Sequence, residues 1–201
     1  MKRTLVLLSL TLPLTLALNA AETVRYDSQP GGGKVTLEGK SSHGVWTMEC
    51  SALGGFIEAD ASFPESAGAR PKVEISIPVR QIKSGKKAMD TRMVSEMKQP
   101  VHPKIEYRVL ELKPKGAPAG GKAEFDATGA LTVSGVTRTN TMAVTITRVD
   151  KTKLKVNGAT TVQMSDHGIK PPSFDVLGVG LMKTEDAVKI TFEWTPEVEK
   201  K

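Results

Sequence analysis

The chain has 201 residues, of which 39% are hydrophobic and 25% are charged, as expected for a soluble protein with one domain of moderate size. Its formal net charge of +6 is scattered along the sequence instead of forming basic blocks, so we do not expect a nucleic-acid-binding protein. Cys50 is the only cysteine, which excludes an internal disulfide, and we interpret it as a small buried hydrophobic residue.

The first 21 residues have the pattern of a secretory signal peptide. Two basic residues precede an uncharged apolar run from Leu5 to Leu18, and small residues follow it. We expect cleavage near Ala20 or Ala21, and therefore a periplasmic or secreted domain of residues 22–201 that does not stay inserted in a membrane. The alternative is an uncleaved membrane anchor, although the apolar run is short for a spanning helix.

Strands are expected throughout the first part of this domain. Four segments alternate apolar and polar residues: 34–38, 45–50, 57–63 and 73–79. In the last segment the apolar residues all point to one face of the strand: Val73, Ile75, Ile77 and Val79. Such alternation predicts a sheet with one wetted face and one enclosed face.

One helix is predicted, at about residues 88–99. It carries methionine at every fourth position, which places these side chains on one face: Met89, Met93 and Met97. Asp90 is the expected N-cap, and Pro100 ends the helix because proline lacks a backbone N–H. The methionine face either covers and lines a cavity or packs on the outside of the sheet, and the sequence leaves both interpretations open.

After the helix the sequence returns to alternation, and its last segment, 188–194, is strictly regular. The pattern changes parity at Leu110, which predicts a bulge or the end of a strand. Gly158 in the middle of a strand predicts a bend or a close approach of backbone. About eight strands separated by short turns predict an all-β fold, an antiparallel barrel or sandwich with one or two short helices. A barrel of this size is filled by side chains or holds one small ligand.

Three histidines are the residues that could support metal binding or catalysis: His43, His102 and His167. None has metal-ligand spacing to a cysteine or to another histidine, but His167, next to Asp166, could join His43 in a copper site. A hydrolase is a further possibility, but the sequence lacks the Gly-x-Ser-x-Gly turn that presents a serine nucleophile. We therefore expect neither a metal nor a catalytic residue.

Four segments, taken together and in this order, resemble the YceI-like family of exported, lipocalin-like barrel proteins. They cover most of the mature chain: Gly39-Lys-Ser-Ser-His-Gly-Val-Trp46, residues 82–107, Leu131-Thr-Val-Ser-Gly-Val-Thr-Arg138 and Met164-Ser-Asp-His-Gly-Ile-Lys-Pro-Pro172. The chain departs from the family pattern at His167, where an aromatic residue is usual, and before Trp46, where it has an extra spacer.

The resemblance implies an antiparallel, lipocalin-like barrel of about eight strands with the helix of residues 88–99 packed against it. It also implies that the barrel holds a long isoprenoid lipid or quinone, and it implies no catalysis and no other cofactor. The candidates for contact with the apolar ligand are Trp46, Ile75, Ile77, Met89, Met93, Met97, Tyr107, Phe125, Val133, Met142, Val144, Val162, Ile190 and Phe192. The candidates for contact with its head group are His43, Arg138 and His167.

Physical chemistry is consistent with such a ligand. A long isoprenoid needs a tube of flexible or branched apolar side chains, and removal of its surface from water would drive binding at ~25 cal/mol per Å². Methionine suits an irregular tube because its unbranched thioether adapts its shape. The alternatives are a metal-handling or hydrolytic protein that uses His43 and His167, and a filled barrel that serves as an interaction module. The oligomeric state is not predicted.

Overall fold

The computed structural model describes residues 22–66, 70–176 and 179–199. The predicted signal peptide, residues 1–21, lies outside the described residues. None of the helices in the described part of the chain has the length and apolar character needed to cross a membrane.

Strands are the main secondary structure of the described chain, which has one α-helix. The strands are β1 Thr23–Asp27, β2 Gly33–Ser41, β3 Gly44–Cys50, β4 Gly54–Asp60, β5 Lys72–Pro78, β6 Lys104–Pro114, β7 Lys122–Val133, β8 Val136–Arg148, β9 Leu154–Gln163, β10 Ser173–Val176, β11 Val179–Trp194 and β12 Glu197–Val198. The α-helix is α1 Lys87–Glu96, and two short 3-10 helices are η1 Val79–Gln81 and η2 Ser165–His167. The predicted β fold is therefore confirmed, with more strands than the eight expected. The additional strands include β10 and β12, which are too short to show alternation.

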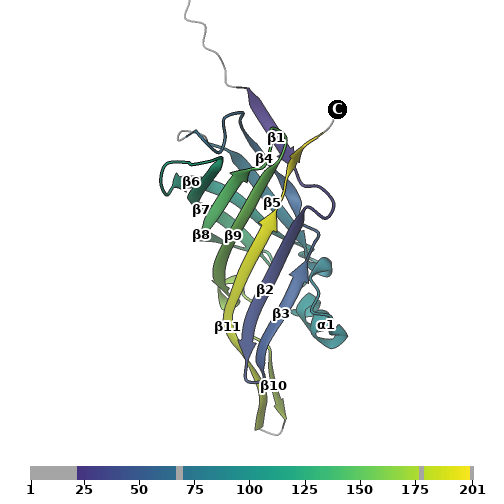
Figure 1. Cartoon of the computed structure of the whole chain (residues 1–201). Coiled ribbons are helices and arrows are strands. Elements are labelled where there is room, and N and C mark those ends of the chain that lie inside the picture. Colours follow the sequence, from purple (N-terminus) through teal and green to yellow (C-terminus); the bar gives the residue numbers. More distant parts are fainter. Residues whose placement is uncertain (1–21, 67–69, 177–178, 200–201) are drawn as a thin grey trace, which may run out of the picture.

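All strands pair antiparallel in one curled sheet with the order β12-β1-β4-β5-β6-β7-β8-β9-β11-β2-β3, and β10 pairs with β11 beside this path (Figure 1). The free edge of β3 meets the segment that follows β5. There the backbone N–H of Glu49 donates to the Lys83 carbonyl and the N–H of Lys83 donates to the Glu49 carbonyl, each at 2.8 Å. These two bonds join the edge of the curled sheet to the connection that leads into α1. We refer to the curled sheet as the barrel.

Local sequence features explain the course of the strands. The turn between β7 and β8 consists of Ser134 and Gly135, whose φ angles of 49° and 78° suit a two-residue hairpin. The register of β6 and β7 shifts between Val109 and Glu111, which confirms the predicted bulge. A Cβ at Gly158 would lie 2.4 Å from the Phe192 ring, so this glycine makes room for a side chain and not for the neighbouring backbone.

The helix begins and ends earlier than predicted. α1 ends at Glu96 instead of residue 99, and Lys98 then takes a left-handed φ of 50°. Asp90 is not the N-cap, because it lies in the first turn of the helix. Its carboxylate instead accepts hydrogen bonds from the backbone N–H and the hydroxyl of Ser84, at 2.7 and 2.6 Å. Asp90 thus ties the helix to the loop before it.

One end of the barrel, which we call the closed end, is packed with side chains. Its largest members are almost fully buried: Tyr26, Phe63, Leu154 and Trp194. Arg148 crosses this end and donates hydrogen bonds from its guanidinium group to the carbonyl oxygens of Ala61 and Phe63. Cys50 is buried in the same cluster, which confirms its interpretation as a small hydrophobic residue, and burial raises the pKa of its thiol.

Candidate ligand-binding cavity

The barrel encloses a cavity of about 850 Å³ between the inner face of the sheet and α1. Nearly every long strand contributes to its wall, and the wall is predominantly aliphatic. The volume lies within the ~300–1,000 Å³ range of sites that hold small molecules. The barrel is therefore hollow along part of its axis and filled at the closed end.

The cavity opens at the end of the barrel opposite to the closed end. The exposed residues in its wall come from the β2–β3 turn, from α1 with the residue before it, and from the end of β9: His43, Gly44, Val45, Lys86, Ala88, Thr91, Ser95 and Gln163. We call this set of residues the mouth. Figure 1 shows α1 beside β3, away from the end that carries β1. One face of α1 thus covers part of the opening, with its methionines turned to the inside.

All but one of the predicted apolar candidates border the cavity. They are Trp46, Ile75, Ile77, Met89, Met93, Met97, Tyr107, Val133, Met142, Val144, Val162, Ile190 and Phe192. The helix methionines therefore lie on the inner side of α1, not on the outside of the sheet. Contact of these side chains with a ligand stays a prediction.

Phe125 does not border the cavity. Its side chain points inward from β7, as alternation predicts, but it lies at the closed end. There its ring stacks on Phe63, with 6.1 Å between the ring centroids. Alternation identifies the inner face of a strand but not the depth of a residue along the barrel axis, so the sequence could not separate Phe125 from the residues that line the cavity.

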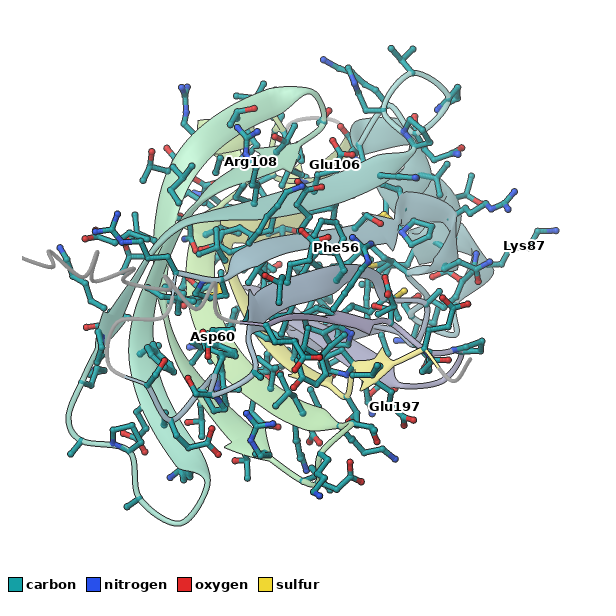
Figure 2. All side chains as sticks on the ribbon, turned by 90° about the horizontal axis from the view of Figure 1, so that it is seen from above. Phe56, Asp60, Lys87, Glu106, Arg108 and Glu197 are labelled. Carbon is teal, nitrogen blue, oxygen red and sulfur yellow. The ribbon has the colours of Figure 1, made fainter. Side chains whose placement is uncertain are left out.

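Strand β6 alternates between residues that face solvent and residues that face the interior. Glu106 and Arg108 project outward from β6, whereas Tyr107 between them is buried (Figure 2). The Tyr107 hydroxyl donates to the carbonyl oxygen of Ala127 at 3.1 Å. Burial raises its pKa to about 12, so the phenol stays protonated at neutral pH. Tyr107 offers its ring to the cavity while its hydroxyl is bound to the sheet.

The two histidines proposed as head-group contacts occupy different environments. His43 is exposed in the β2–β3 turn at the mouth, with Nδ1 3.3 Å from the Ser42 hydroxyl. His167 borders the cavity, and only 3% of its surface is exposed. Its Nδ1 lies 3.0 Å from the Val136 carbonyl, which can only accept, so Nδ1 donates and Nε2 of the neutral ring is an acceptor.

The third proposed head-group contact, Arg138, lies outside the cavity wall. The turn before β8 is confined to residues 134–135, and Arg138 belongs to β8. Its Nε donates to the carbonyl oxygen of Asp166 at 3.0 Å, which ties β8 to η2. Arg138 thus holds the loop that carries His167, and it does not border the cavity.

Trp46 is a cavity residue with a buried polar atom that has no partner among the described residues. A Cβ at Gly39, its cross-strand neighbour, would lie 2.1 Å from the indole, so the ring rests directly on the β2 backbone. The indole Nε1–H is buried, and no acceptor for it is present among the described residues. An unpaired buried donor is costly, so this N–H is available to a ligand. The sequence alone identified Trp46 only as an apolar residue.

A model of the YceI-like domain matches residues 26–195 of the chain. The chain belongs to the YceI-like family. Its fold is similar to that of BcnA from Burkholderia cenocepacia, with a TM-score of 0.66, 18% identity, and coverage of 84% of this chain and 99% of BcnA. A search among curated proteins found no match.

Two further solved structures share the fold of this YceI-like chain. A polyisoprenoid binding domain from Saccharophagus degradans, implicated in plant cell wall breakdown, has a TM-score of 0.66 at 13% identity. The match covers 88% of this chain and 99% of that domain. A YCEI protein from Campylobacter jejuni has a TM-score of 0.56 at 14% identity, with 76% and 85% of the two chains covered.

In the described part of this YceI-like chain, the polar side chains form neither a metal-binding cluster nor a Ser-His-Asp triad. No group of three or more His, Cys, Asp or Glu residues that could hold a metal ion is present among the described residues. Nδ1 of His167 is oriented by a backbone carbonyl, and the Ser165 hydroxyl hydrogen-bonds to Asp186. The observed arrangement therefore offers a hollow apolar site with a few polar atoms, and these polar atoms lie near its mouth.

Proposed function

We propose that this YceI-like chain is a binding protein that holds one long isoprenoid chain, such as a polyprenyl lipid or the tail of a quinone, inside its barrel. The observation that carries the proposal is the cavity of about 850 Å³, lined by aliphatic and methionine side chains and open at one end. The relative from Saccharophagus degradans that shares the fold is described as a polyisoprenoid binding domain, and this description supports the same class of ligand.

The proposed ligand matches the wall of the cavity. Transfer of each ligand CH₂ group from water into the apolar tunnel contributes about 0.8 kcal/mol, and the ordering of a flexible chain offsets part of this gain. Met89, Met93 and Met142 border the cavity, and their thioethers adapt to the methyl branches of an isoprenoid. The role is binding, by storage, sequestration or carriage, and no catalytic step is part of the proposal.

The polar end of the ligand would lie near the mouth. The Trp46 Nε1–H would donate to a head-group oxygen, and His167 Nε2 would accept from a hydroxyl or remain free. His43 stands at the rim. A quinone carbonyl, a prenol hydroxyl or a phosphate oxygen would each satisfy the indole donor. The filled-barrel alternative loses its basis, because the centre of the barrel is hollow.

Export is part of the same proposal. The sequence of residues 1–21 has a basic start, an apolar run and small residues at the cleavage region. We expect the mature protein in the periplasm or outside the cell, with its N-terminus at Ala21 or Glu22. Mass spectrometry of the protein from a fractionated host measures this terminus directly, and an intact Met1 in the cytoplasm would refute export.

Extraction of the purified protein with organic solvent, followed by mass spectrometry, tests the binding role. We expect a stoichiometric isoprenoid with the native protein. Met93→Asp should remove it, because the carboxylate would lie against the apolar tunnel. Val94→Asp is the matched control, since it introduces the same charge one residue further along α1, outside the cavity wall. Equal lipid content in both variants, or no lipid in any sample after incubation with a prenol, would refute the proposal.

A further inference from the structure

We propose that the mouth end of the barrel is a docking surface for an anionic phospholipid membrane. The surface consists of residues 79–104, which connect β5 to β6 through α1, and of the β2–β3 turn. The inference rests on the proposed function, because a water-insoluble isoprenoid must be taken from or delivered to a membrane. It goes beyond that function because it names the side of the molecule that faces the bilayer and the charge of the lipids that this side binds.

The charge distribution is the first observation. Residues 79–104 contain seven basic side chains and two acidic ones. The basic residues are Arg80, Lys83, Lys86, Lys87, Arg92, Lys98 and Lys104. The basic excess of this segment is larger than that of the whole domain of residues 22–201, which has 26 basic and 22 acidic residues. A cluster of lysine and arginine beside a membrane is attracted to anionic lipids.

The second observation is where the ion pairs lie. The lysines that form ion pairs with carboxylates in the described structure all lie outside this segment: Lys34, Lys72, Lys113, Lys115, Lys122, Lys153 and Lys155. Within the segment, the Asp90 carboxylate is occupied by Ser84, and Glu96 lies 3.6 Å from Arg92. Lys86 and Lys87 are exposed, and Figure 2 shows the Lys87 side chain extending away from the body of the protein. These ammonium groups are available to phosphates.

Two exposed apolar residues belong to the same surface. Val45, at the tip of the β2–β3 turn, is 62% exposed and also borders the cavity, next to His43 and Gly44. Val101, within the basic segment, is 73% exposed. Exposed branched side chains beside lysines suit the interface of a bilayer, where they enter the acyl boundary while lysines contact the head groups.

The chemistry of the surface favours a membrane over a protein partner. Its apolar residues are single and separated, whereas the centre of a stable protein interface is a contiguous apolar patch depleted of lysine. A second copy of the chain would bring the same positive charges together. An anionic bilayer supplies both phosphates for the lysines and an apolar layer for Val45, and it places the mouth directly at the source of the ligand.

Co-sedimentation with vesicles tests the docking surface. We expect the purified protein to bind phosphatidylglycerol–phosphatidylcholine vesicles at low salt, to bind pure phosphatidylcholine vesicles weakly, and to be released by high salt. The double change Lys86→Glu with Lys87→Glu should weaken binding to anionic vesicles by about tenfold or more. The matched control is Arg70→Glu with Lys151→Glu, two exposed residues away from the mouth that receive the same change in charge.

A second pair of variants tests the apolar contact of Val45 with the bilayer. Val45→Asp should reduce vesicle binding, whereas Val149→Asp, at a valine that is 54% exposed in the β8–β9 turn, should not. Circular dichroism confirms that each variant is folded. The proposal is overturned if the wild-type protein ignores anionic vesicles, or if the mouth variants and the control variants bind them equally.

A transfer assay separates this proposal from the proposed function. The long polyprenol solanesol is offered either in detergent micelles or in anionic vesicles. The variant Lys87→Glu with Lys98→Glu, two exposed residues outside the cavity wall, should load normally from micelles and several-fold more slowly from vesicles. Failure of the wild-type protein to load from either source would refute the lipid-binding function, while vesicle binding would still report on docking. Equal transfer rates from vesicles for wild type and variant would overturn the docking surface.

Discussion

At the scale of single residues, Trp46 provides a hydrogen-bond donor as well as apolar surface. Its indole lies directly against Gly39, and its Nε1–H is buried without an acceptor in the described residues. We expect Trp46→Phe to weaken binding of an oxygen-bearing isoprenoid, such as solanesol, by about 1 kcal/mol beyond its effect on the hydrocarbon squalene. The comparison cancels the loss of apolar area, which both ligands share. Fluorescence-quench titration measures both affinities, and an equal loss for the two ligands would show that the indole N–H contacts no head group.

At the scale of elements, Arg148 fastens the segment of residues 61–66 across the closed end. Its guanidinium donates to the Ala61 and Phe63 carbonyls and pairs with Glu65 at 2.9 Å. Arg148→Met should lower the free energy of unfolding by about 1–3 kcal/mol, because these acceptors lose their donor. Urea unfolding at pH 7 measures the effect. Lys155→Met, which breaks an exposed pair with Glu193, is the control and should cost less than about 1 kcal/mol.

The stability that the Arg148–Glu65 pair contributes should depend on pH. Partial burial alone would raise the pKa of the Glu65 carboxyl, but the hydrogen bonds and charge of Arg148 outweigh it, and the pKa is lowered. A lowered folded-state pKa stabilises the protein above the unfolded value of about 4.3, and this contribution is lost as the pH falls through the folded value. The difference in stability between wild type and Arg148→Met should therefore shrink from pH 7 to pH 3. A constant difference would show that Glu65 does not contribute.

The contrast between correct and incorrect sequence predictions also belongs to this scale. Alternation identified the inner faces of the strands, so Ile75, Ile77 and Ile190 were placed correctly. It could not give depth along the axis, and Phe125 was therefore assigned to the cavity. Asp90 looked like a helix cap because its side chain can accept from backbone, but the backbone it serves is that of Ser84, before the helix. Such contacts depend on tertiary folding, which a local pattern does not contain.

At the scale of the whole molecule, the barrel is divided into a packed part and a hollow part, and the same chemical change should have opposite consequences in the two. Ala123 is 4% exposed in the closed-end cluster and does not border the cavity. Val162 borders the cavity from β9. Ala123→Phe should destabilise the protein by about 1–3 kcal/mol, because a close-packed core has no room for a ring. Val162→Phe places its ring in empty space and should leave the stability of the ligand-free protein nearly unchanged.

The two substitutions should affect ligand binding in the opposite way to stability. Val162→Phe fills part of the tunnel and should lower the affinity or the length of isoprenoid that the barrel accepts, whereas folded Ala123→Phe should bind as the wild type does. Solanesol in excess should raise the melting temperature of the wild type, since a ligand at 100 times its Kd stabilises the folded state by about 2.7 kcal/mol. Differential scanning calorimetry with and without solanesol measures both effects. If Val162→Phe destabilises the ligand-free protein as much as Ala123→Phe does, the interior is packed throughout and has no room for a lipid.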